Sequence, residues 1–211
     1  MSATATAYRF AKERLLDGRF AAGALLSENE IARDLGISRT PVREAFLLLE
    51  AEGLLELYPR RGALVTPISP TESDDVLEAR LLLEGHCAGA VRRADPTLDE
   101  ALAEAIAAQE EAVTGAATEG HVFTVADRDF HRALVAAHGN EILTRQYDSL
   151  RDRQQRIAAT AVARSRERIV QFIAEHRQIA AALAAGDGAR ARELVAEHLH
   201  RAHDLARRAR D

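Results

Sequence analysis

Three histidines and one aspartate in the second half of the chain have the types and spacing of a metal site. Asp127 and His131 are four residues apart, so on a helix both side chains can reach one ion. When each residue advances by about 100°, His176 and His198 fall on the apolar arcs of two later segments. Neutral imidazoles with a carboxylate suit a divalent first-row metal such as Zn, Ni or Mn. We therefore predict that these four side chains converge on a divalent metal ion.

Other histidines are excluded by the same helical phase. His200 and His203 fall outside the apolar arc that contains His198. His138 lies two turns from His131, about 10 Å along a helix axis, which predicts a capping or outer role rather than ligation. A single inward histidine is more often a satisfied core residue than a ligand. Three of them with an aspartate are costly to bury without a common partner, and this favours the metal.

Arg80 is the other side chain with chemistry to offer. It points into the apolar arc of its segment, with Glu84 one turn further on, among Val76, Leu83, Cys87 and Ala90. One interpretation is an internal ion pair between Arg80 and Glu84. The other is that Arg80 binds an anionic effector, since a planar guanidinium matches a carboxylate. The sequence is compatible with both interpretations.

These residues require a helical scaffold to bring them together. Residues 71–211 show no strand signal, and glycine or proline occurs only as punctuation, as at Gly139-Asn140 and Gly186-Asp187-Gly188. Asp95 caps a helix that has Pro96 at its first position. The pattern predicts an all-α bundle of six helices, at 72–92, 96–114, 119–138, 141–163, 166–185 and 188–209.

A different chemistry is suggested near the start of the chain. Arg39 and Arg43 are four residues apart and project together from the N-terminal half of a helix that Ser38 begins as its N-cap. Arginine grips guanine bidentately in the major groove, and recognition helices lead with their N-terminal residues. Thr40, between them, suits a phosphate. The alternative is that both arginines are ordinary solvated charges on a helix surface.

The surrounding elements are those of a winged helix-turn-helix. A short helix over 28–35 precedes a turn at 36–38, and the second helix turns one face inward through Val42, Ala45, Phe46, Leu48 and Leu49. Short strands at 54–57 and 63–66 flank a hairpin. Its tip carries Arg60, Arg61 and Gly62, which we include with Ser38, Arg39, Thr40 and Arg43 among the predicted DNA-binding residues.

Length and charge fit two domains. The chain of 211 residues is long enough for a DNA-binding domain at 1–69 and an effector-binding and dimerisation domain at 70–211, joined near Pro67 and Pro70. Its net charge of -5 argues against indiscriminate binding to nucleic acid, and residues 1–69 hold nine basic and nine acidic residues. DNA affinity would then depend on where the cations lie and on doubling them in a homodimer.

The compartment follows from what the sequence contains. No stretch approaches the roughly 20 apolar residues of a membrane span, and residues 1–7 have neither the charged start nor the apolar middle of a signal peptide. The single cysteine, Cys87, fits a reducing compartment. These observations predict a cytoplasmic protein without a membrane partner.

Several motifs in order resemble the GntR family of bacterial transcription regulators: 26–28, 38–45, 49–54 and 61–63. The stretch 127–134, followed by Gly139-Asn140, resembles the ligand-binding domain called FCD, which occurs in the FadR branch of that family. Many members of that branch bind a metal through an aspartate and three histidines at matching positions, and an arginine corresponding to Arg80 holds the effector. One departure is Asn29, where many members place an arginine.

The resemblance and the residues together predict a metabolite-responsive regulator that is not an enzyme. We expect a homodimer on a palindromic double-stranded DNA operator, acting as a repressor that a small organic acid releases. One alternative is a metal-dependent hydrolase, although no acidic residue at a fixed short spacing stands out as a general base. The other is a regulator whose metal is purely structural.

Overall fold

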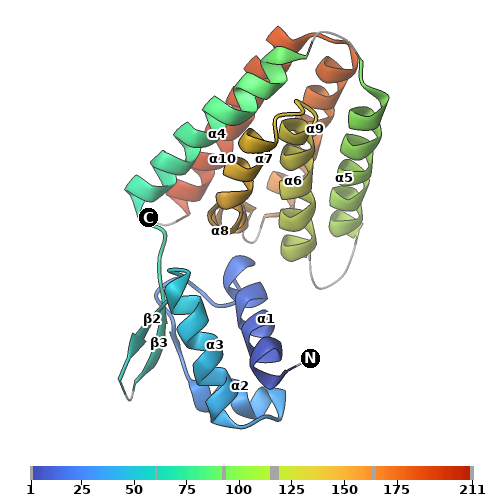
Figure 1. Ribbon diagram of the computed structural model, residues 1–211. Coiled ribbons are helices and arrows are strands. Elements are labelled where there is room, and N and C mark those ends of the chain that lie inside the picture. The colour runs from blue at the N-terminus through green and yellow to red at the C-terminus, as the bar shows by residue number, and fades with distance from the viewer. Residues whose placement is uncertain (1, 60, 92–93, 115–118, 163–164, 210–211) are drawn as a thin grey trace. The chain divides into compact units, whose positions relative to one another are not determined.

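The computed structural model describes residues 2–59, 61–91, 94–114, 119–162 and 165–209 (Figure 1). The chain divides into two compact units, Met1–Ile68 and Ser69–Asp211. No helix in these described stretches is both long enough and apolar enough to cross a membrane.

The first unit contains the predicted pair of helices and the hairpin. Its helices are α1 (Ala3–Leu16), α2 (Glu28–Leu35) and α3 (Arg39–Ala51). The strands β1 (Leu25–Leu26), β2 (Leu55–Tyr58) and β3 (Gly62–Val65) form an antiparallel sheet in the order β1-β3-β2. The sequence patterns had not indicated α1 or β1. Together these elements enclose one core, whose members include Ala11, Leu15, Ile31, Phe46, Leu49 and Val65.

The turn between α2 and α3 and the helix after it have the predicted conformation, with two differences. Gly36 adopts the left-handed conformation at φ 65°, which glycine allows at low cost. Ser38 occupies the N-cap position of α3, but its side chain makes no capping hydrogen bond. The inward direction predicted for Leu48 is wrong, since it is 51% exposed. The buried face of α3 is narrower than predicted, because α1, α2 and β2 pack mainly against the side that carries Val42, Ala45, Phe46 and Leu49.

The second unit is all-α, as predicted, but one predicted helix is divided. Its helices are α4 (Pro70–Ala90), α5 (Pro96–Thr114), α6 (Glu119–Ala136), α7 (Glu141–Ser149), α8 (Arg151–Val162), α9 (Arg166–Ala184) and α10 (Gly188–Arg208). The described residues thus form seven helices instead of six. The extra break is at Leu150, where the Leu150 N–H donates to the Tyr147 carbonyl in a tighter turn and α8 starts immediately afterwards.

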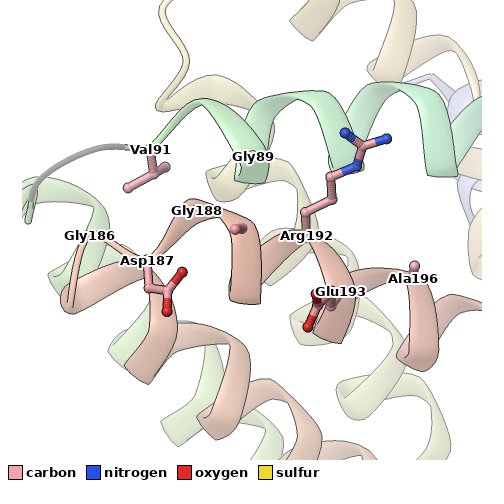
Figure 2. A pocket seen from close by; sticks show the side chains of 9 residues that line it. Gly89, Val91, Gly186, Asp187, Gly188, Arg192, Glu193 and Ala196 are labelled. Carbon is pink, nitrogen blue, oxygen red and sulfur yellow. The ribbon is translucent and has the colours of Figure 1, made fainter.

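Helices α4 and α10 run side by side in close contact (Figure 2). Gly188, at the start of α10, lies so close to the end of α4 that a Cβ there would be 2.4 Å from the Val91 carbonyl oxygen. Further along, the stem of Arg192 lies over Gly85 and Gly89 of α4. Small residues therefore let the two helices approach, and this approach fixes where the later residues of α10 meet the rest of the unit.

Candidate metal centre and DNA-binding surface

The structure brings together the four residues that helical phase selected. Asp127 and His131 lie on α6, His176 on α9 and His198 on α10, and all four are buried. One potential ligand atom from each lies within 4.8 Å of the others. The packing of α6, α9 and α10 thus gathers one carboxylate and three imidazoles into a single cluster.

The spacing inside this cluster fits a metal ion. Nε2 of His176 is 3.2 Å from Nε2 of His198, and Asp127 Oδ1 is 3.6 Å from Nε2 of His176. Two nitrogen ligands on one tetrahedral ion are about 3.3 Å apart, given bonds near 2.0–2.1 Å. Nε2 of His131 lies 3.9 Å from Asp127 Oδ1 and has no hydrogen-bond partner in the described part of the chain. A buried nitrogen without a partner, facing two other imidazoles, is what a metal would satisfy.

Each histidine is held from behind by an oxygen of another side chain. Nδ1 of His176 is 2.7 Å from Oε1 of Gln109 on α5. Nδ1 of His198 is 2.8 Å from Oε2 of Glu175. An oxygen at Nδ1 accepts the ring N–H, which leaves the lone pair of Nε2 free to face the cluster. Such partners orient ligating histidines and make them more basic.

The third histidine connects the cluster to Arg80. Nδ1 of His131 is 2.7 Å from Oε2 of Glu84, and Nε of Arg80 donates to Oε1 of the same carboxylate over 2.6 Å. The predicted ion pair of Arg80 and Glu84 is therefore present, within a longer chain that ends at His131. The side chain of Arg80 is only 11% exposed. Its ion pair does not occupy every donor of the guanidinium, which has five N–H groups.

Burial and charge set the protonation of this cluster. Desolvation lowers the pKa of His176 well below its usual value, with His198, His131 and Arg80 adding to the effect. Desolvation also lowers the pKa of His198, although Glu175 opposes it. Burial would raise the pKa of Glu84, but Arg80 and His131 outweigh it and bring the pKa to about 2. Neutral imidazoles at neutral pH are the form that binds a metal.

The sequence did not indicate which side chains stand behind the histidines. Gln109 could have been noticed as a polar residue on the otherwise apolar inner face of its helix, where it is fully buried. Glu84 was assigned only to Arg80. Glu175 is adjacent to His176 in the sequence yet supports His198, so only the crossing of α9 and α10 reveals its role.

Four other histidines that the structure describes, His86, His138, His200 and His203, are not members of this cluster. His200 is exposed, whereas His203 is buried with Nε2 2.8 Å from Asp74 Oδ1. Helical phase was wrong about the burial of His203 because α10 is covered by α4 as well as by α8 and α9. His138 is exposed, and its ring packs against that of His86 at a centroid distance of 5.1 Å.

In the first unit, the predicted DNA-binding residues lie on an open surface. Ser38, Arg39, Thr40 and Arg43 are all exposed at the N-terminal half of α3. The Nε of Arg39 is 2.5 Å from Oε2 of Glu28 on α2, although the Arg39 side chain remains 58% exposed. This arrangement leaves the face of α3 accessible to a groove.

The wing tip carries one exposed cation and a required glycine. Arg61 is exposed, whereas Arg60 lies outside the described residues. Gly62 has φ 109°, and a Cβ there would lie 2.2 Å from the Leu26 carbonyl oxygen on β1. Gly62 therefore serves the backbone, because it allows β3 to pair with β1 directly at the tip of the hairpin.

The model of bacterial regulatory proteins of the gntR family matches residues 4–65, and the FCD domain model matches residues 75–201. The chain belongs to the GntR family of transcription regulators. As a GntR regulator with an FCD domain it is not an enzyme, and the hydrolase alternative is not favoured.

Relatives of this GntR regulator cover nearly its whole length. A protein of Paenarthrobacter nicotinovorans named "Probable D-xylose utilization operon transcriptional repressor" is 33% identical over 186 residues, 88% of this chain and 80% of its own. A GntR transcriptional regulator from Rhodococcus sp. RHA1 has the same fold, with a TM-score of 0.78 at 24% identity over 98% of each chain. A metal-free FCD domain gives a TM-score of 0.56 at 20% identity, covering 68% of this chain and 96% of that one.

Proposed function

We propose that this GntR regulator is a cytoplasmic repressor that binds a palindromic operator as a homodimer and is released by a small carboxylate. The observation that carries the sensing half of this proposal is the buried cluster of Asp127 and three histidines, connected through Glu84 to Arg80. A buried cationic side chain that is connected to a set of metal ligands suits an anion.

The first unit supplies operator contacts. Arg39 and Arg43 read base edges from α3, Thr40 and the N-terminus of the helix at Ser38 contact phosphate, and the wing with Arg60, Arg61 and Gly62 lies against the neighbouring backbone. Arg39 exchanges Glu28 for DNA at small cost, since an exposed ion pair contributes only about 0–1 kcal/mol. Two copies of this surface, related by a two-fold axis, would take the two half-sites of a palindrome.

The second unit supplies the sensor. Asp127, His131, His176 and His198 would hold a divalent ion such as Zn, Ni or Mn, leaving room for a further ligand. When bound, the ion would supply positive charge that attracts one carboxylate oxygen of the effector. The guanidinium of Arg80 would bind the other oxygen with donors that Glu84 does not use.

Helix α4 is the route by which the sensor reaches the DNA-binding unit. It starts at Pro70, next to the boundary between the units, and carries Arg80 about 15 Å further along its axis. Its first turn is tied to α8 by an ion pair of Glu72 with Arg153 at 2.8 Å and to α10 by the contact of Asp74 with His203. An effector that prefers one position of α4 would therefore shift the equilibrium between operator-competent and operator-incompetent states.

An operator-binding titration tests this function. With the native upstream DNA and Zn²⁺-loaded protein, a carboxylate such as glycolate, lactate or gluconate should weaken binding by about 5- to 150-fold, the usual range of allosteric coupling. Arg80→Ala should abolish the response and keep basal DNA binding. Arg145→Ala is the matched control, because Arg145 forms an exposed ion pair with Glu141 at the same i,i+4 spacing.

The alternative in which the metal is purely structural predicts a different result. Asp127→Ala and His176→Ala would then lower the melting temperature but leave the response to the carboxylate intact. A response that is lost together with metal binding, while the protein remains folded, would instead support the sensor.

A further inference from the structure

The exposed side of α3 carries leucines as well as arginines. Leu47 and Leu48 are 50% and 51% exposed, in the part of the helix that follows Arg43. Each leaves apolar surface in contact with water, which a binding partner could cover with a gain in free energy. The operator contacts proposed for α3 include neither leucine.

Helical geometry gives the two leucines different directions. Leu47 is four residues after Arg43 and eight after Arg39, so the three side chains form one row along the helix. Leu48 lies about 100° further around the helix axis. Leu47 therefore continues the row of arginines, whereas Leu48 does not.

Hydrogen bonds of two glutamates mark the limits of the open side of α3. Glu44 accepts a hydrogen bond from the Thr4 hydroxyl on α1 over 2.7 Å. Glu50 accepts one from the backbone N–H of Leu57 on β2 over 2.8 Å. Around the helix axis, Leu47 lies between these two glutamates, about 60° from each. It therefore occupies the middle of the face that α1 and β2 leave open.

Double-stranded DNA matches the chemistry of this face. The row begins with two guanidinium groups, which suit guanine edges, and continues with an apolar side chain. In the major groove, the C5-methyl group of thymine is the apolar group that a base edge presents. Leu47 lies about 6 Å along the helix axis beyond Arg43. Recognition helices such as that of a homeodomain read bases over about two turns, so Leu47 is within reach of the next bases.

We propose that Leu47 packs against the C5-methyl group of a thymine in each operator half-site, so that the regulator prefers thymine at that position. The inference rests on the proposed function, in which Arg39 and Arg43 enter the major groove. Leucine offers no hydrogen bond, and it recognises the base by removing apolar surface from water. The arginines select guanine through hydrogen bonds, and Leu47 adds a preference for a neighbouring methyl group.

Uracil is the probe, because it lacks only the methyl group of thymine and keeps the same O4 acceptor. Fluorescence anisotropy with the full chain compares the native upstream fragment made with thymine and the same fragment made with uracil. Loss of the methyl groups should weaken wild-type binding roughly 4-fold for each contact, the value of one buried hydrocarbon group. Leu47→Ala should bind the thymine fragment more weakly by a similar factor and bind both fragments almost equally. Single uracils then locate the contacted base.

Leu48→Ala is the matched control, because Leu48 has the same side chain and the same exposure but lies outside the row. It should keep the full difference between the two fragments. The melting temperature should change little in either variant, since both leucines are exposed.

The other outcomes overturn the inference and separate it from the proposed function. If wild-type protein binds both fragments equally, or if Leu47→Ala keeps the difference, Leu47 does not contact a methyl group, although operator binding stands. If Leu48→Ala removes the difference, the row along α3 is not the face that reads the base. If wild-type protein binds neither fragment, the proposed function fails, and the contact is rejected with it.

Discussion

The two units contain ion pairs of the same composition in opposite environments. Arg39 contacts Glu28 at the surface of the first unit, where the arginine side chain is 58% exposed and the glutamate 12% exposed. Arg80 contacts Glu84 inside the second unit, where the two side chains are 11% and 0% exposed. The exposed pair contributes about 0–1 kcal/mol, whereas breaking a buried pair by removing one partner costs about 3–5 kcal/mol.

This difference separates two ways of recognising a ligand. Arg39 can leave Glu28 for DNA, because the pair costs little to open and water replaces the lost contact. Arg80 keeps Glu84 and has to use its remaining donors for an effector. We infer that the first unit depends on exposed side chains carried by a fixed backbone, and the second on a buried network in which every member holds its neighbour.

Removal of the exposed arginines on α3 should have the largest effect on operator binding. Arg39→Ala with Arg43→Ala should weaken operator binding by about 2–6 kcal/mol, since each bidentate base contact contributes about 1–3 kcal/mol. Melting temperature and Zn²⁺ binding in the second unit should not change. Fluorescence anisotropy at several salt concentrations measures the effect, and unchanged affinity in the double variant would refute the proposed contacts.

Removing one member of the buried network should have a different signature. Zn²⁺ at one hundred times its dissociation constant should stabilise the wild-type protein by about 2.7 kcal/mol, and His176→Ala should abolish this gain. His200→Ala is the control, because His200 lies on α10 but is exposed. Thermal unfolding with and without chelator measures both. A full gain in His176→Ala would show that the cluster does not hold the ion.

The stability of the metal-free protein should depend on pH through the buried histidines of the second unit. Native His176 and His198 have lowered pKa values, so below about pH 6.5, the usual value, the unfolded chain binds protons that the native protein does not. Metal-free protein should therefore lose stability as the pH falls from 7.5 to 5.5, by at most about 1.4 kcal/mol per pH unit for each of the two histidines. Denaturation of wild type and His176→Ala across this range tests the sign, since the variant should show a shallower slope and parallel curves would contradict the assignment.

The sequence predicted features that are local along the chain and missed those that depend on contacts between distant segments. Helical phase found Asp127, His131, His176 and His198, because periodicity records which face of each helix is buried. It could not find Gln109 behind His176, since that contact depends on which helices become neighbours.

In the DNA-binding motif, too, the sequence predicted the local features but not the contacts between distant segments. The turn at Gly36, the helix with Arg39 and Arg43, and the hairpin are all local features, and each was predicted. The predicted burial of Leu48 is wrong, because the exposure of this side chain depends on how much of α3 the neighbouring elements cover. The pairing of β1 with β3 also joins segments distant in the sequence, and it gives Gly62 a role that the hairpin alone did not suggest.

The smallest expected effects come from glycine substitutions, which test whether the backbone of the first unit is rigid. Gly36 and Gly62 both have positive φ, but a Cβ at Gly36 would meet no atom within 4 Å, whereas one at Gly62 would be 2.2 Å from the Leu26 carbonyl oxygen. Gly36→Ala should cost about 1 kcal/mol from conformation alone. Gly62→Ala should cost about 2–3 kcal/mol, because separating β1 from β3 adds to that strain.

Hydrogen exchange of the amides in β1 and β3 measures this difference without interference from the second unit. Gly62→Ala should also weaken operator binding, since the displaced wing carries Arg61, whereas Gly36→Ala should change affinity less. Equal protection in the two variants would mean that β1 yields easily to the added methyl group. The position of the wing would then not be set by its backbone, and the contrast with the buried network of the second unit would no longer hold.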